Sequence, residues 1–282
     1  MSAAVRHPAV AGTFYPGDPN DLDSLVRGCL AKGAAASRLR DKGDGRLFAL
    51  MLPHAGYVYC GHVIGATLAD LALPGRFVVL CPNHTGQGHP FGVWPDGAWL
   101  TPLGPVAVDG VLAASLVKGI YALDTRSHLR EHSIEVLLPF LQILTRNEAQ
   151  IVPVCVGTRE PQALRAAGLE LAAALTALYR EDPAGVCILV SSDMNHYENE
   201  QITLKKDAMA LEKALSCDPE GLLAVVAERG ITMCGAAPLA VALFAAKALG
   251  KPSAGLVMHD TSARASGDAT RTVGYAGLRF HL

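Results

Sequence analysis

Two histidines follow apolar segments at the point where each segment must end. His54 comes after the run 47–52 and His84 after the run 77–81, in both cases with a proline between the run and the histidine. A continuous apolar run is typical of a buried strand, and proline cannot donate a hydrogen bond to a sheet ladder. Both histidines are therefore expected beyond the carboxyl ends of strands, where ligands bind in open α/β sheets.

A third apolar run, 186–190, leads directly into the polar sequence SSDMNHY. Its Asp193 and His196 are expected to face the same crevice. A carboxylate there could hold a histidine ring in one tautomer, and a histidine could transfer protons at a reacting ligand. The alternative is structural, with Asp193 capping the next turn and His196 packing on Tyr197.

His132 lies in the sequence EHSIE, which opens an apolar helix over 136–144. His132 and Glu135 are three residues apart and are expected on one face, near the positive end of that helix. Stabilisation of the helix explains Glu135 adequately. His132 has no such explanation and competes with His196 for the role of catalytic acid or base.

Cys234 precedes the helix predicted over 239–249. A helix N-terminus lowers the pKa of a thiol and favours the thiolate, so Cys234 is placed for reactivity. Cys81, Cys155 and Cys187 instead lie in or beside apolar runs. Because the chain has no CxxC pair, we expect all seven cysteines to be reduced.

Two histidines and a cysteine form a ligand set that suits zinc, iron(II) or copper better than magnesium or calcium. Three protein ligands would leave a coordination position open to substrate or water. The chain contains no HExxH, GxSxG, GxGxxG or P-loop sequence, so no serine hydrolase, dinucleotide or nucleoside triphosphate site is indicated.

These residues require a scaffold that brings strand ends together. The patterns predict one α/β domain over residues 1–282, with a central mixed sheet flanked by helices. Strands are expected at 47–52, 77–81, 149–156, 186–190, 254–259 and 272–280, and helices at 21–32, 61–71, 110–120, 136–144, 162–179, 205–216, 219–229 and 239–249.

Two further segments are irregular. Residues 34–45 mix small and charged residues without periodicity, which favours a surface loop. Residues 88–108 hold both tryptophans among prolines and glycines and predict a short antiparallel excursion. It is either a hairpin with aromatic packing or a lid over the crevice.

The composition excludes several classes of partner. A net charge of −2 and a pI near 6.5 give no electrostatic footprint for nucleic acid or for an anionic membrane surface. The first residues lack the apolar core of a signal peptide, and the alanine-rich stretches are too short or too interrupted to span a bilayer. The expected compartment is the cytoplasm.

Seven ordered motifs resemble the Memo family, also called AmmeMemoRadiSam system protein B. They are AGTFYPG, PHAGYVYCG, LCPNHTG, EHSIEVLLPF, SSDMNHYE, MCGAAP and SGDATRTVGYAGL, and they extend over nearly the whole chain. The resemblance implies a fold like that of class III extradiol dioxygenases. It also implies a metal bound by His54, His84 and Cys234, with Asp193 and His196 lining the pocket, and a functional link to a radical SAM protein.

Cys234 stands where those dioxygenases use a carboxylate, and a thiolate donates more charge and is itself oxidisable. Three hypotheses follow. The first is a redox-active metalloprotein with iron or copper, zinc being an alternative metal. The second is a non-heme iron dioxygenase, and in both of these cases a small molecule would bind in the pocket. The third is a non-enzymatic module that holds a peptide or another partner there.

Overall fold

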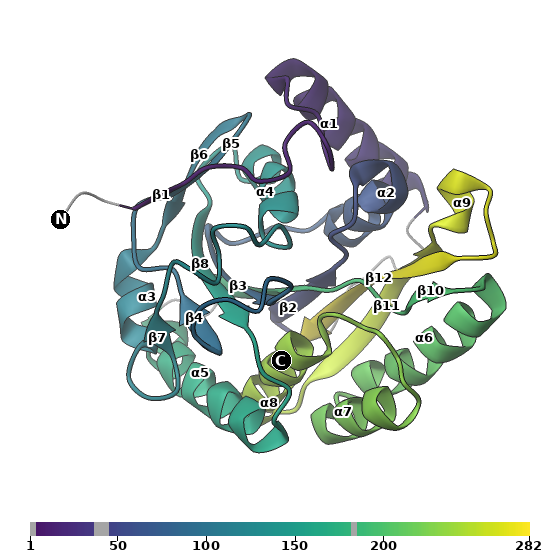
Figure 1. The fold of residues 1–282 in the computed structure, drawn as a ribbon. Coiled ribbons are helices and arrows are strands. Elements are labelled where there is room, and N and C mark those ends of the chain that lie inside the picture. Colours follow the sequence, from purple (N-terminus) through teal and green to yellow (C-terminus); the bar gives the residue numbers. More distant parts are fainter. Residues whose placement is uncertain (1–3, 37–44, 182–184) are drawn as a thin grey trace.

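A mixed sheet runs through the middle of the molecule (Figure 1). The structure, a computed structural model, describes residues 4–36, 45–181 and 185–282. In this part of the chain the sheet has twelve strands, nine of them in the order β1-β5-β6-β8-β3-β9-β2-β12-β10, while β11 pairs with β12 and β4 with β7 and β8. The prediction of an α/β fold with a central mixed sheet flanked by helices is confirmed.

The strands are β1 (Val5–Arg6), β2 (Leu47–Leu52), β3 (Arg76–Pro82), β4 (Phe91–Val93), β5 (Ala98–Thr101), β6 (Gly104–Val108), β7 (Ala122–Leu123), β8 (Gln150–Val156), β9 (Val186–Ser191), β10 (His196–Glu198), β11 (Ser253–Thr261) and β12 (Thr272–His281). The helices are α1 (Pro19–Ala36), α2 (Tyr57–Leu68), α3 (Gly110–Leu116), the 3-10 turn η1 (Glu135–Leu137), α4 (Leu138–Leu144), α5 (Pro161–Glu181), α6 (Glu200–Leu215), α7 (Pro219–Glu228), α8 (Ala236–Leu249) and α9 (Ala263–Ser266).

The parallel strands β8, β3, β9 and β2 lie side by side at the centre of the sheet. Parallel strands are usually covered on both faces and are then apolar throughout, and β3 and β9 are buried along almost their whole length. Because β9 lies between β3 and β2, the carboxyl ends of all three strands meet at one edge. This arrangement brings the three polar strand ends together.

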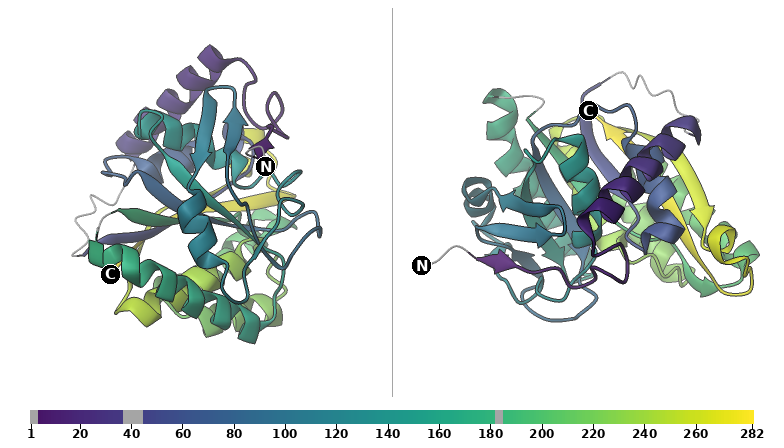
Figure 2. Two further views of the ribbon diagram at one scale, coloured as in Figure 1. Left: turned by 90° about the vertical axis from the view of Figure 1, so that its left-hand side faces the viewer. Right: turned by 90° about the horizontal axis from the view of Figure 1, so that it is seen from above.

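Helices cover both faces of the sheet (Figure 2). Successive side chains of a strand point to opposite faces, so Val78 and Leu80 of β3 pack in a core with α3, α5, α6, α7 and α8. Phe77 and Val79 pack in the second core, with α1, α2 and α4. None of the helices in the described residues combines the length and hydropathy needed to cross a membrane.

Some helix boundaries differ from the predicted ones. Helix α2 begins at Tyr57 and not at residue 61, so the loop that carries His54 is short. Helix α3 ends at Leu116, before the predicted 120. The loop predicted over 34–45 begins within helix α1, which runs to Ala36, and residues 37–44 lie outside the described residues.

The excursion over 88–108 is a hairpin and not a lid. Strands β5 and β6 pair antiparallel, and β6 joins the sheet beside β8. Trp94 and Trp99 are buried, their ring centroids 5.7 Å apart, and both rings contact His128. No residue of this segment lines the cavity described below. The aromatic side chains close the core at this edge of the sheet.

His128 makes the folded protein sensitive to acid. It is fully buried, its Nε2–H donates to the carbonyl of Gly92 at 3.0 Å, and burial lowers its pKa to about 4. As the pH falls below the ordinary value of about 6.5, the unfolded chain takes up a proton that the folded chain does not bind. Stability is therefore complete above about pH 6.5 and decreases towards pH 4.

We expect the titration of His128 to lower the free energy of unfolding by about 2 kcal/mol between about pH 7.5 and about pH 5. Urea unfolding of the wild type and of His128→Gln at the two pH values measures it, because the variant lacks the titrating ring. A stability difference between the two proteins that stays constant with pH would contradict the expectation.

Candidate metal centre

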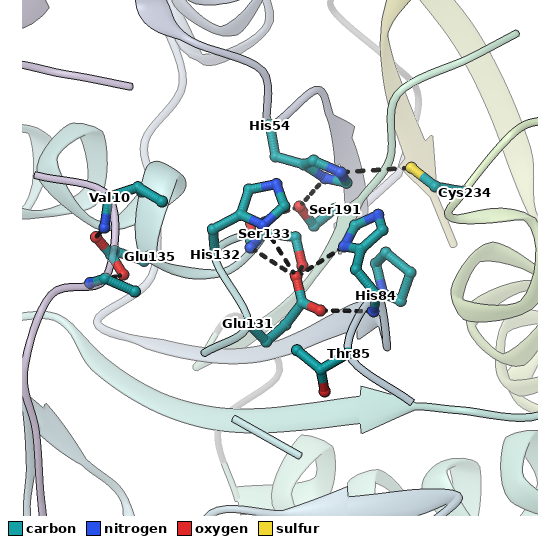
Figure 3. Close-up of polar contacts among 12 residues, drawn as sticks. Val10, His54, His84, Thr85, Glu131, His132, Ser133, Glu135, Ser191 and Cys234 are labelled. Carbon is teal, nitrogen blue, oxygen red and sulfur yellow. Dashed lines mark hydrogen bonds and ion pairs between the residues drawn. The ribbon is translucent and has the colours of Figure 1, made fainter. Parts of the chain in front are cut away.

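Three histidines meet at the carboxyl edge of the parallel strands (Figure 3). His54 follows β2, His84 follows β3, and His132 lies in the loop before η1. One ring nitrogen from each lies within 4.8 Å of the other two. Among the described residues this is the only group of three or more histidine, cysteine or acidic side chains that could hold a metal ion. We call it the histidine cluster.

Ser191 determines the tautomer of His54. The Ser191 hydroxyl donates its single proton to the carbonyl of Ser133 at 2.6 Å, so it can only accept from His54 Nδ1 at 2.7 Å. The His54 proton is therefore on Nδ1, and Nε2 carries a free lone pair. His54 is 2% exposed, and burial together with the neighbouring histidines lowers its pKa well below the ordinary value. The ring is held neutral, as a metal ligand must be.

Glu131 likewise determines the tautomer of His84. The ring Nδ1 donates to Glu131 Oε1 at 2.8 Å, and the backbone N–H of His84 donates to Oε2 at 2.7 Å. The hydroxyl and the backbone N–H of Ser133 also donate to Oε1. Burial of Glu131 would raise its pKa, but these bonds outweigh burial and lower it to about 2. Glu131 is thus a buried, ionised group that leaves His84 Nε2 free for a ligand.

The charge of Glu131 acts on His84 in return. Burial would lower the pKa of His84, but the hydrogen bond and charge of Glu131 raise it above the ordinary value. The His84 side chain is 35% exposed and thus more open to solvent than the buried His54. Sequence reasoning missed Glu131, although it lies in the EHSIE sequence next to His132. A carboxylate adjacent to a candidate histidine was the available signal.

Asp193 lies at the site but does not have the contact expected of it. Its Oδ1 accepts the backbone N–H of His54 at 2.8 Å and so holds the loop after β2. The groups that orient imidazole rings are instead Ser191 and Glu131. Asp193 is 5% exposed, and burial raises its pKa despite the hydrogen bond from His54.

Cys234 stands two residues before helix α8, near its N-terminus as predicted. Its Sγ lies 3.4 Å from His54 Nε2 and accepts the backbone N–H of Asp193 at 3.2 Å. The predicted lowering of its pKa is wrong, because burial and the charge of Asp193 raise the pKa of this thiol far above its usual range. All seven cysteines are free, and Cys234 alone among them is half-buried.

Of the two candidate acid–base histidines, His132 belongs to the cluster and His196 does not. His132 is half-buried, stacks on His84 with ring centroids 5.0 Å apart, and lies 3.6 Å from Glu131 Oε1. Burial lowers its pKa. His196 does not join the cluster but lines the same cavity, and its Nδ1 donates to the carbonyl of Thr232 at 3.0 Å. His132 thus belongs with the candidate ligands as well as with the candidate acid–base groups.

The cavity in front of the cluster has a volume of about 720 Å³. Its walls include the aromatic side chains of Phe14, Tyr59, Tyr197 and Tyr275. Asp193 and His196 supply polar groups beside the three histidines. A concave site with apolar walls and a few convergent polar groups is the usual form of a small-molecule site.

Glu135 holds the N-terminal arm, residues 4–15, against this cavity. It forms a fully buried ion pair with Arg6 at 2.6 Å. It also accepts the backbone N–H groups of residues 9–10 and the hydroxyl of Tyr15. The arm thereby places the Phe14 ring 4.9 Å from that of His132. Glu135 therefore has contacts beyond the helix stabilisation that the sequence predicts for it.

Comparison with known proteins assigns the family. The family model described as Memo-like protein matches residues 6–279. The chain belongs to the Memo family. A MEMO1 family protein of Methanopyrus kandleri is 37% identical over 98% of both chains, and one of Ignicoccus hospitalis is 39% identical over 99% of both.

The fold of this Memo-family chain is shared more widely. A crystal structure of an uncharacterized protein from Escherichia coli K12 superposes with a TM-score of 0.55 at 15% identity, covering 83% of this chain and 99% of the other. At that identity the likeness shows a common fold alone. The architecture agrees with the dioxygenase-like scaffold that the sequence motifs imply.

Proposed function

We propose that this chain is a redox-active metalloprotein that binds one iron or copper ion at the histidine cluster. The observation that carries the proposal is the convergence of three ring nitrogens within 4.8 Å, with the outer nitrogens of His54 and His84 occupied by Ser191 and Glu131. Rings oriented in this way present lone pairs to one point and are typical of metal sites.

The donor set fits a transition metal. Imidazole and thiol groups suit iron, copper or zinc, whereas magnesium and calcium prefer oxygen. His54, His84 and Cys234 are the proposed ligands, although Cys234 is not part of the histidine cluster and is joined to it only through its Sγ, 3.4 Å from His54 Nε2. His132, the third member of the cluster, is a further donor. A bound iron or copper ion would supply Lewis acidity and one-electron redox chemistry at the base of the cavity. The raised pKa of Cys234 means that its proton must leave when a metal binds.

The chain's own residues divide the remaining tasks. Ser191 and Glu131 accept the Nδ1–H of His54 and of His84 and so hold both imidazole rings in one orientation. His196, with its proton on Nδ1, can accept a proton from a ligand at Nε2, and Asp193 lies beside it at the cavity wall.

A second candidate function is that of an oxygen-using, non-heme iron dioxygenase. It is favoured by the presence of a fourth histidine, His196, in the lining of the same cavity. A non-enzymatic module that holds a small molecule or peptide would need only the cavity. Ligand binding that is equally tight with and without metal would support the module.

We also propose a cytoplasmic location, where free thiols stay reduced, and a functional link to a radical SAM protein.

The Cys234 ligand is tested by adding cobalt(II) or copper(II) to metal-free protein. A thiolate ligand produces a thiolate-to-metal charge-transfer band, which is expected in the wild type and in His132→Ala but not in Cys234→Ser. If Cys234→Ser keeps the band, the sulfur is not a ligand.

Glu131→Gln is expected to weaken metal affinity by roughly 10-fold to 100-fold, because the amide removes the negative charge that holds His84. Calorimetric titration of metal-free protein measures the affinity, and thermal unfolding shows whether the variant is folded. Glu148→Gln, an exposed position, is the control. Unchanged affinity in a folded Glu131→Gln protein would contradict the role assigned to Glu131.

A further inference from the structure

Two loops that are far apart in the sequence meet beside the histidine cluster. The first, residues 192–195, follows β9 and carries Asp193, with His196 directly after it. The second, residues 229–235, lies between α7 and α8 and carries Cys234. The relative position of the loops therefore decides how the thiol of Cys234 lies against His54 and how His196 lines the cavity.

Asn195 joins the two loops from the inside. It is fully buried, and its Oδ1 accepts both the backbone N–H and the hydroxyl of Thr232, each at 3.1 Å. Its Nδ2 donates to Glu198 Oε2 at 2.7 Å, and its backbone N–H donates to Asp207 Oδ1 at 2.9 Å. Both ends of the amide thus have partners that suit this orientation of the side chain.

Thr232 in turn holds His196 at two points. The Thr232 hydroxyl accepts the backbone N–H of His196 at 2.7 Å, while its own proton points to Asn195. The Thr232 carbonyl lies 3.0 Å from His196 Nδ1. Because a carbonyl oxygen can only accept, the neutral ring must carry its proton on Nδ1 and a lone pair on Nε2. Thr232 thus selects the tautomer in which Nε2 is a base.

The loop 192–195 and the loop 229–235 also contact each other next to Cys234. The backbone N–H of Asp193 donates to Cys234 Sγ at 3.2 Å, and the backbone N–H of Gly235 donates to Ser192 Oγ at 3.1 Å. A Cβ atom at Gly235 would come within 2.3 Å of Ser192 Cβ, so the loops approach more closely than any other residue would permit.

We infer that Thr232 is a positioning residue that couples the thiol of Cys234 to the proton-accepting ring of His196. This inference extends the proposed metal function, in which Cys234 binds the metal and His196 transfers protons. Among the described residues, its hydroxyl is the one side-chain group that hydrogen-bonds to both Asn195 and the backbone of His196, so its removal should free the two loops from each other.

The test uses the full-length, metal-free protein, so that it does not depend on metal binding. Thr232→Val removes the hydroxyl while preserving the shape of the side chain, and Thr232→Ser restores the hydroxyl. Thr176→Val is the matched control, since the Thr176 hydroxyl donates to the carbonyl of Ala172 within helix α5 at 2.8 Å. Nitrogen-15 NMR of the imidazole reports the tautomer of His196, and the rate of alkylation by iodoacetamide reports the access to Cys234.

In Thr232→Val the ratio of the Nδ1–H to the Nε2–H tautomer is expected to fall by roughly 3-fold to 10-fold, the effect of losing one net hydrogen bond. Alkylation of Cys234 should accelerate by a similar factor, and Thr232→Ser should return both values to those of the wild type. If Thr232→Val matches the wild type in both measurements, the inference is wrong, whatever the metal content. If both values shift but the wild type binds no metal, the coupling stands and the metal proposal fails.

Discussion

Replacing His54 by alanine is expected to abolish stoichiometric metal binding. His54 is buried between the other two rings and the thiol, with its Nε2 3.4 Å from Cys234 Sγ and its ring centroid 5.3 Å from that of His84. Loss of a direct ligand should exceed the roughly 10-fold to 100-fold effect expected for loss of an orienting partner. Calorimetric titration with iron(II), copper(II) and zinc into metal-free protein measures the change.

His62→Ala is the matched control for this experiment. His62 also lies close to a carboxylate, with Nε2 2.8 Å from Asp260, but it is on helix α2 outside the histidine cluster. The control should bind one metal ion with wild-type affinity, and His84→Ala should behave like His54→Ala. Wild-type affinity in both His54→Ala and His84→Ala would exclude the cluster as the metal site.

Glu135→Ala is expected to lower the free energy of unfolding by about 3–5 kcal/mol, the cost of breaking a buried ion pair from one side. The Arg6 and Glu135 side chains are 0% exposed, so the variant leaves the guanidinium without its counter-charge. Tyr15 and the backbone of residues 9–10 lose their acceptor as well. Urea denaturation followed by circular dichroism provides the measurement.

The exposed pair Arg27–Asp23 provides the comparison. Its side chains are 63% and 40% exposed, and Arg27→Ala should change stability far less than Glu135→Ala, because solvent screens an exposed ion pair. Glu135→Ala should also release the arm that places Phe14 beside His132, and it should therefore become more sensitive to proteolysis near the N-terminus. A stability loss no larger than that of Arg27→Ala would show that Glu135 does not anchor the arm.

The strand ends could be predicted because local chemistry determines them. An apolar run ends at Pro53 or Pro82 whatever the rest of the chain does, and a histidine after it lies at the carboxyl end of a buried strand. The run 186–190 has the same character and lies between the other two strands in the sheet. Sequence reasoning therefore placed His54, His84 and Asp193 at the same edge.

The contacts that orient these groups could not be predicted, because they join distant parts of the chain. Ser191 and His54 are 137 positions apart, and Glu131 and His84 are 47 apart. Nothing local marks Glu135 as the partner of Arg6, 129 positions away. For Cys234, the proximity to a helix N-terminus was visible in the sequence, whereas the burial that raises its pKa was not.

The most direct test of the metal proposal is elemental analysis of the untagged protein purified without added metal or nickel resin. We expect about one iron or copper ion per chain in the wild type, and a content near zero in the variant with alanine at His54, His84 and Cys234. Circular dichroism should show that the variant is folded. A wild-type protein that contains no transition metal and binds none on reconstitution would contradict the account.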